Sequence, residues 1–292
     1  MARRFRESDH PRHPRGSSRG GEFREKATGW VGRISDRLAL PSAKDILQGK
    51  VSNEQMATLG RELEGRYGSG GMTVRNVHVW RVGGDDQSPF NPVGHLEIGG
   101  EIVSDDDPDN IHEGYFRVTA SQTRKQEEND PLIWRAYIDR MHVRGAAQGG
   151  GGGRELTARL VDWFRRSGFD EVGVGPSEIG SYAWGAMGFD FGDFTDRKIA
   201  WEGAMTMTLQ QVRDHFNWGT SAYGDPELPL TDKQIERMIR QYRWAATRAV
   251  AGTMSYQQLS QYGRKKGQGK NDWWAGKLGL IIGGVGSGKI KL

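Results

Sequence analysis

Hydrophobic and polar side chains alternate along four stretches in the first half of the chain. Clusters of Gly, Asp and Pro separate these stretches, which are Thr73 to Val82, Val93 to Val103, Tyr115 to Thr123 and Trp134 to Val143. A period of two is typical of strands with one buried face. We therefore predict four strands before residue 144.

One helix is predicted ahead of these strands. It begins at Ser52, whose hydroxyl forms a capping-box pattern with Gln55, and it is expected to end near Gly68. Its buried stripe consists of the apolar side chains Met56, Leu59, Leu63 and Tyr67. A short amphipathic piece, Trp30 to Leu40, precedes it, and no second early helix is evident.

A run of glycines directly follows the fourth predicted strand. Gln148 is followed by five glycines, 149–153, and Arg154 then opens a helical pattern that stops at Gly168. Glycines leave backbone N–H groups accessible, and a helix start adds unpaired amides and a positive dipole end. This order favours a bound phosphate or pyrophosphate; a flexible glycine linker is the alternative. A strand, Glu171 to Val174, and a short helix, Glu178 to Met187, are predicted next.

With these elements in order, roughly residues 50 to 195 resemble the GNAT superfamily, the Gcn5-related N-acetyltransferases, which carry acyl groups from coenzyme A. In that family a strand ending in Val leads, five residues on, to a Q/R-x-x-G-x-G/A loop around the pyrophosphate of acetyl-CoA. Here Val143 precedes Gln148, Gly151 and Gly153 at that spacing, and Gly188-Phe189 matches a Gly-Phe pair that ends the family's later helix. The resemblance implies an α+β fold with a mixed sheet.

The resemblance also implies a site for acetyl-CoA, with its pyrophosphate on the glycine amides and its pantetheine along the end of the fourth strand. The residues that would bind it are Met141, Val143, Gln148, Gly149, Gly150, Gly151, Gly152, Gly153 and Ser177. Ser177 stands where the family usually has an Asn.

Two catalytic positions depart from the family pattern. The Glu that many members carry on the strand before the loop is Tyr137 here, and the Tyr that protonates the leaving thiolate is Trp184. An indole N–H only donates, so Trp184 is no practical acid. Asp139, on the same strand face as Tyr137, is the substitute base; a solvated or ion-paired carboxylate is the alternative. Tyr182 points about 200° away from Trp184 on a regular helix, so it replaces the lost hydroxyl only if the backbone is irregular.

Composition excludes several classes of protein. A chain of 292 residues with 35% hydrophobic content and no Cys has a core but no disulfides, thiolate metal sites or thiol nucleophiles. No apolar run approaches the roughly 20 residues of a membrane helix, and the Arg-rich start lacks the apolar core of a secretory signal. The acidic turn 105–110 lacks the Gly and Glu of an EF-hand, so it is interpreted as a solvated hairpin tip and no metal site is expected.

Charge is distributed unevenly along the chain. Residues 1–26 hold eight basic and four acidic side chains, residues 264–292 hold seven and one, and the middle holds 26 and 32. Basic ends could contact nucleic acid or an acidic protein surface, or simply keep the protein soluble. The stretch from Asp9-His10-Pro11-Arg12 through Gly20-Gly21-Glu22-Phe23 is similar to N-terminal or linker segments of actinobacterial phage and mobile-element proteins. That similarity implies phage head or portal partners and a place in the host cytoplasm or the virion.

Two further helices are predicted after the region of resemblance, at Met205 to Phe216 and Thr231 to Gly252. The second has a capping box at Thr231 and Gln234, and its apolar face consists of Ile235, Met238, Ile239, Tyr242 and Ala246. This face could pack on the core or meet a partner. Near the end, Gly283 to Lys289 resembles a phosphate loop, but Ile290 replaces the metal-binding Ser or Thr. A strand at Leu280 to Ile282 and a tail are expected instead.

The predicted organisation is a basic tail at 1–40, a GNAT-like domain at 41–200, a helical extension at 201–263 and a Gly/Lys-rich tail at 264–292. The predicted function is an acyl-CoA-dependent N-acyltransferase that acts on an amine and is phage-encoded. The alternative is a virion or head-morphogenesis protein that uses a degenerate GNAT-like module without catalysis. A head-maturation protease has little support, because Gly175-Pro176-Ser177-Glu178 is not a G-x-S-x-G elbow.

Overall fold

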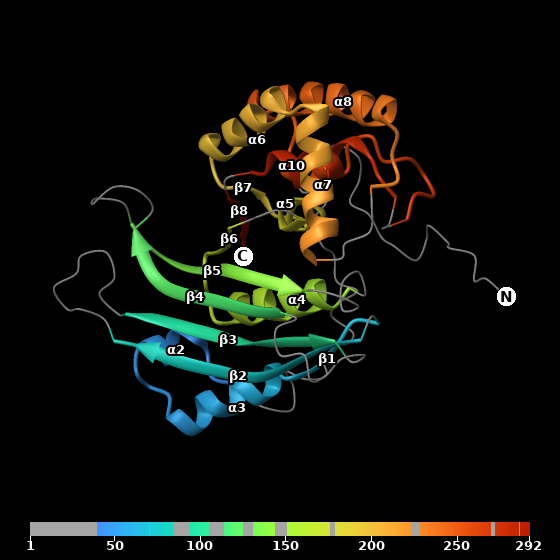
Figure 1. Cartoon of the computed structure of the whole chain (residues 1–292). Helices are drawn as coiled ribbons and strands as arrows, with labels where there is room; N and C mark the ends of the chain where they lie inside the picture. Colours follow the sequence, from blue (N-terminus) through green and yellow to red (C-terminus); the bar gives the residue numbers. More distant parts are fainter. Residues whose placement is uncertain are drawn as a thin grey trace. The chain divides into compact units, whose positions relative to one another are not determined.

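Among the residues that the structure describes, eight strands form one open sheet (Figure 1). The computed structural model describes residues 40–69, 71–83, 94–104, 114–124, 131–143, 151–175, 179–223, 228–269, 272–285 and 287–292. The strands are β1 (Gly65–Tyr67), β2 (Met72–Val82), β3 (His95–Ser104), β4 (Gly114–Arg124), β5 (Leu132–Val143), β6 (Glu171–Val174), β7 (Asp190–Phe191) and β8 (Gly288–Lys291). Their order in the sheet is β1-β2-β3-β4-β5-β6-β8-β7.

The sheet is mixed. Neighbouring strands from β1 to β5 are antiparallel, β5 and β6 are parallel, and β8 runs antiparallel to both β6 and β7. The four strands predicted from alternation and the fifth at Glu171–Val174 are confirmed. The expected combination of helices with a mixed sheet is therefore confirmed as well, whereas the likeness to the GNAT layout stays a prediction.

Within the described residues, two short helices precede the sheet, α2 (Ala43–Leu47) and α3 (Asn53–Leu63). The capping box of Ser52 and Gln55 is present as predicted. The predicted end near Gly68 is wrong: α3 stops at Leu63, Gly65 takes φ 127, and Gly65–Tyr67 form β1. A positive φ favours glycine and ends the helical pattern there. The five-residue α2 was not predicted, although the Ser42 side chain caps the backbone N–H of Asp45.

Helix α4 (Gly152–Arg166) supplies much of the core beside the sheet. Leu156, Leu160 and Phe164 are buried, as their helical spacing predicts. Its far end is joined to the start of α2, since the backbone N–H of Ala43 donates to Ser167 Oγ at 2.9 Å and Trp163 Nε1 donates to the carbonyl of Pro41 at 3.1 Å. The helix therefore fixes β5 against the first helices of the chain.

The second half of the described chain is mostly helical. Its helices are α5 (Ile179–Ala186), α6 (Phe194–Thr206), α7 (Leu209–Tyr223), α8 (Asp232–Val250), α9 (Tyr256–Ser260) and α10 (Ala275–Gly283). The predicted helix Met205 to Phe216 is wrong in its bounds, because Met207 and Thr208 are not helical and separate α6 from α7. Thr208 and Gln211 then cap each other across the start of α7, with the backbone N–H of Thr208 donating to Gln211 Oε1 at 2.8 Å.

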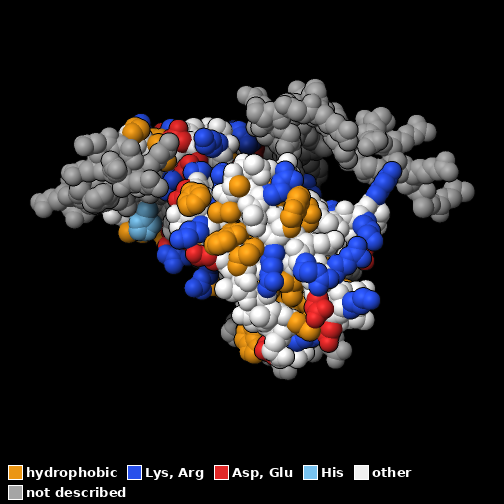
Figure 2. Space-filling model, turned by 90° about the horizontal axis from the view of Figure 1, so that it is seen from above, with side chains coloured by type: hydrophobic (Ala, Val, Ile, Leu, Met, Phe, Trp, Pro, Cys, Tyr) orange, Lys and Arg blue, Asp and Glu red, His pale blue; other side chains and the backbone are white. Residues whose placement is uncertain are grey.

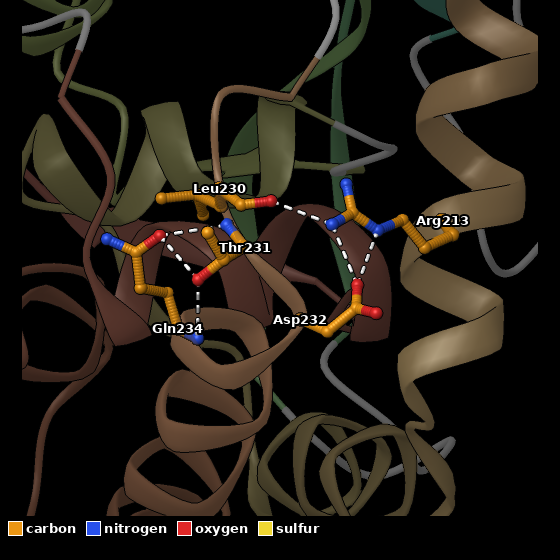
Figure 3. A network of polar contacts seen from close by, with 5 residues as sticks. All are labelled: Arg213, Leu230, Thr231, Asp232 and Gln234. Carbon is orange, nitrogen blue, oxygen red and sulfur yellow. Dashed lines mark hydrogen bonds and ion pairs between the residues drawn. The ribbon is translucent and has the colours of Figure 1, made fainter.

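Helix α8 confirms the prediction for residues 231–252. Its apolar face is buried in the same core as the sheet residues, so that face packs within the molecule. Figure 3 shows how α7 and α8 are joined: Arg213 donates to the Asp232 carboxylate at 2.8 Å and to the carbonyl of Leu230 at 2.7 Å. The predicted capping box of Thr231 and Gln234 lies beside this contact.

The expected strand at Leu280 to Ile282 is wrong, because these residues lie in α10. Nearly the whole of α10 is buried, and its glycines allow neighbouring helices to pack close to its backbone. A Cβ at Gly279 would lie 2.1 Å from Cγ of the buried Tyr242 on α8. The segment expected as a C-terminal tail thus contributes α10 and β8 to the fold.

Described residues from Leu40 onward belong to one compact unit, and α6 crosses the expected boundary at residue 200. Among the described helices, none has the length and apolar character needed to cross a bilayer. The Trp30 to Leu40 piece, apart from Leu40, and the acidic turn 105–110 lie outside the described residues.

Candidate functional site

A β-bulge lies at Asp139 on β5. Ile138 pairs with Val118 and Arg140 pairs with Arg117, so Asp139 has no residue of β4 opposite it. A bulge adds one residue to a strand and re-aims the side chains that follow it. Without it, continued alternation would place position 141 on the same face as Asp139.

The side chains beyond the bulge meet the start of α4. Thr157 Oγ1 lies 3.4 Å from Met141 Sδ, and a Cβ at Gly153 would lie 3.6 Å from Met141 Sδ and from Val143 Cγ2. The structure thus brings together three of the residues proposed for coenzyme binding: Met141, Val143 and Gly153. Gly151 and Gly152 directly precede Gly153 in the chain.

The Asp139 carboxylate is held in a partly buried, polar setting. Burial raises its pKa above the ordinary value, while a hydrogen bond with Thr119 and the charge of Arg117 act in the opposite direction. Its Oδ2 is buried, and no hydrogen bond to it forms within the described part of the chain. A carboxylate with a raised pKa accepts a proton more readily than an ordinary Asp.

Tyr137 occupies the same face, as alternation predicts, because it pairs with Thr119, which also contacts Asp139. Its ring lies over Gly173 of β6, where a Cβ would be 2.7 Å from Tyr137 Cδ2. Burial, and then the charge of Asp139, raise the pKa of Tyr137. The phenol is therefore a neutral hydroxyl at physiological pH, placed beside Asp139.

The parallel strands β5 and β6 separate after the pair Ile138 and Val174. Their pairing runs from Arg135 with Glu171 to Ile138 with Val174, and the last contact is from the Gly175 N–H to the Ile138 carbonyl at 3.5 Å. Strand β5 then continues to Val143, but β6 has ended. Within the described ranges, the edge of β5 beyond Ile138 faces no partner strand on that side.

The start of α4 contacts side chains at the end of β5, since a Cβ at Gly153 would lie 3.6 Å from Met141 Sδ and from Val143 Cγ2. The helix begins at Gly152, two residues earlier than its apolar pattern predicts, with Gly151 as its N-cap at φ 85 and no side-chain cap. Among the described residues, a Cβ at Gly151 would meet nothing within 4 Å. A Cβ at Gly152, by contrast, would lie 2.7 Å from Met72 Sδ, so this glycine is needed for packing. The first N–H groups of a helix have no acceptor within it and suit an anion.

Tyr182 and Trp184 face different neighbours on the regular helix α5. Trp184 is buried edge-on against Phe189, with ring centres 5.4 Å apart. Tyr182 contacts Trp274 at 5.5 Å between ring centres and forms a hydrogen bond with Gln261; burial raises its pKa. These neighbours are not shared with Asp139, so no described contact joins the two catalytic candidates. Gln148, Gly149, Gly150 and Ser177 lie outside the described residues.

A polar hollow that the sequence does not predict lies on the Tyr137 face of the sheet. It has a volume of about 350 Å³, and its lining includes Arg135, Tyr137, Glu171, Asp196, Lys289 and Lys291. Arg135 is ion-paired with Glu171, and Ser287 Oγ donates to Asp196 at 2.9 Å. No sequence signal links these residues, because only the insertion of β8 beside β6 brings them together. The hollow offers both carboxylates and ammonium groups to a small polar molecule.

Comparison with known proteins finds no family model and no curated protein sequence that matches this chain. Among the described side chains, no group of three or more His, Asp or Glu is arranged to hold a metal ion.

Proposed function

We propose that the protein is an acyl-CoA-dependent N-acyltransferase that acts on a small amine. The proposal depends on two observations: β5 parts from β6 beyond Ile138, and the start of α4, which has no side-chain cap, contacts Met141 and Val143 at the end of β5. An extended thiol arm fits along an unpaired strand edge, because that edge offers backbone donors and acceptors. The helix start suits a pyrophosphate.

The types of residue around this strand edge suit the binding of coenzyme A. The amides of Gly152 and Gly153 would hold the pyrophosphate, while Met141 and Val143 line the approach along β5. The coenzyme supplies an acyl group already activated as a thioester. The chain's own task is then mainly to position the amine and to receive its proton.

Asp139 is the proposed base. It lies beside the place where β5 loses its partner, and its raised pKa suits the removal of a proton from an ammonium group. The neutral Tyr137 hydroxyl beside it helps to orient the amine. The polar hollow next to Tyr137 is the proposed acceptor site, since the Asp196 and Glu171 carboxylates suit an ammonium group.

Calorimetry with coenzyme A tests the binding step. We expect wild-type protein to bind more tightly than millimolar, and Gly151→Asp to weaken binding at least 10-fold, because a carboxylate at the N-cap repels the pyrophosphate. Gly151→Asn is the matched control, since it has the same shape, tolerates a positive φ and carries no charge.

Coenzyme A binding that is unchanged in the Gly151→Asp variant would show that the pyrophosphate is not bound at this helix start. Wild-type binding weaker than millimolar would refute the proposal as a whole.

A second candidate is a virion component that uses this fold without catalysis. The observation in its favour is that the family's two usual catalytic positions are Tyr137 and the buried Trp184. This candidate predicts cosedimentation with capsid or portal particles and no thiol release from acetyl-CoA with any amine. Thiol release that saturates with one amine would exclude it.

A further inference from the structure

One face of α8 carries a stripe of basic residues around a tryptophan. The exposed side chains of this stripe are Lys233, Arg237, Arg240, Trp244 and Arg248. At 100° per residue they fall within a sector of about 80°, directly opposite the buried face around Tyr242 and Ala246. The stripe extends for about 22 Å along the helix.

The positive charges of this stripe are not neutralised locally. Among the described residues, no acidic side chain forms an ion pair with Lys233, Arg237, Arg240 or Arg248. Of the two acids on α8, Asp232 is bound by Arg213, and Glu236 lies to one side of the stripe. An ordinary solvated helix face mixes both signs of charge, so this one-sided distribution points to an anionic partner.

The chain after α9 adds to this surface. Gly263 approaches α8 at Gln241, and the exposed Lys265 and Lys266 follow it. A hollow of about 350 Å³ lies between α8 and this segment, and Arg237, Gln241, Lys265 and Trp273 are part of its lining. In Figure 2, which views this side of the molecule, Lys and Arg side chains lie among exposed hydrophobic ones.

Trp244 distinguishes between anionic partners. Its side chain is 51% exposed, with Arg248 over its ring at 5.0 Å and Tyr262 beside it at 5.4 Å between ring centres. An acidic protein surface uses the charges but does not need an exposed indole in line with them. Single-stranded nucleic acid uses both, because phosphates follow basic side chains while bases stack on aromatic rings.

We propose that the α8 stripe, together with the hollow beside Lys265, binds single-stranded nucleic acid. The backbone phosphates contact Arg237, Arg240 and Lys265, and a base stacks on Trp244. This surface is separate from the proposed coenzyme site and does not depend on acyl transfer.

Fluorescence anisotropy with labelled oligo(dT) of about 20 nucleotides tests the proposal on the full chain. Log affinity should fall linearly with log salt, and Arg237→Gln/Arg240→Gln should reduce that slope by about 1.4, since each phosphate contact on a single strand contributes about 0.7. The matched control is Arg165→Gln/Arg166→Gln, which removes two exposed charges from the end of α4. Circular dichroism verifies that all variants are folded.

The stacking step has its own pair of variants. Trp244→Ala should weaken oligo(dT) binding about 10-fold, whereas Trp80→Ala, which removes an indole 44% exposed on β2, should not. The proposal is overturned if wild type does not bind oligo(dT), or if the two-arginine variant keeps the wild-type slope, since binding then lies elsewhere, for example in residues 1–39. It is also overturned if a duplex or polyglutamate binds as tightly and Trp244→Ala has no effect.

Discussion

The Asp139 carboxylate imposes an energetic cost on the folded chain. Its Oδ2 is buried without a hydrogen-bond partner among the described residues, and burial raises its pKa. A raised pKa means that the folded state holds the proton more tightly than the unfolded state. Below the ordinary value of 3.8 both states are protonated, and as pH rises through the raised pKa the folded state loses stability relative to the unfolded state.

We therefore expect Asp139→Asn to stabilise the protein at neutral pH by about 1 kcal/mol, since an amide removes the desolvated charge. The gain should disappear below pH 3.8, where the aspartic acid is already neutral. Urea unfolding at the two pH values measures this difference. Asp170→Asn is the control, because Asp170 Oδ2 accepts a hydrogen bond from the Trp134 N–H at 2.8 Å and should not stabilise.

The same variant has a second readout if acyl transfer occurs. Loss of a general base should lower turnover about 10²-fold or more while leaving coenzyme A binding unchanged. A gain in stability that is equal at both pH values would instead show that Asp139 is ionised as freely as a surface carboxylate.

Among the elements, α8 and α10 form a close helix contact for which a single glycine is responsible. Gly279 leaves room for the Tyr242 ring, because a Cβ would lie 2.1 Å from its Cγ. Helix propensity alone makes Gly279→Ala stabilising by about 1 kcal/mol. Packing makes it destabilising by about 1–3 kcal/mol, because the buried ring cannot move aside.

We expect the packing penalty to exceed the gain in helix propensity, so Gly279→Ala should lower the urea midpoint of unfolding. Gly269→Ala is a suitable control, since a Cβ there meets only Asp272 Oδ2 at 3.8 Å. A rise in stability in the Gly279 variant would mean that α10 does not press against α8.

How far the elements could be predicted depends on their periodicity. Strands β2 to β5 have one buried face and α8 has a clear stripe, so alternation and helical spacing identified them. Helix α6 buries only Asp196, Ala200 and Ala204, which leaves almost no pattern, and α10 is apolar on all sides, which resembles a buried strand. The four residues of β8 form a strand because β6 and β7 lie on either side of them.

The candidate site was only partly predictable for the same reason. The glycine run before α4 and the alternation of Asp139 with Tyr137 can be identified in the sequence. The bulge at Asp139 and the end of β6 pairing at Val174 depend on register between distant strands. The residue type makes Tyr182 a candidate acid, but its neighbours Trp274 and Gln261 come from the far end of the chain.

At the scale of the whole molecule, β8 lies between β6 and β7 and so connects β7 to the rest of the sheet. The Leu292 N–H donates to the Asp170 carbonyl at 3.0 Å, so by alternation the Ile290 N–H also faces β6, opposite the buried Val172. The Lys291 N–H faces the other side, where pairing with β7 has already ended.

Ile290→Pro should therefore destabilise the protein by about 1–3 kcal/mol, since it leaves a buried carbonyl of β6 without its donor. Lys291→Pro should have little effect, and Ile290→Ala measures the part due to the side chain. Hydrogen exchange at Glu171–Val174 locates the damage. If both proline variants behave alike, β8 is not the inner strand between β6 and β7.

The position of β8 also bears on how the molecule is made. Ser287 meets Asp196 across 91 positions of sequence, and β8 pairs with β6 across a still longer separation, with Gly288 opposite Val174. While the ribosome is still synthesising the helices between them, β6 has an open side that can pair with other nascent chains. We therefore expect sheet closure to be a slow folding step. Overexpression at low temperature, or with a chaperone that shields exposed strands, should increase the yield of correctly folded protein.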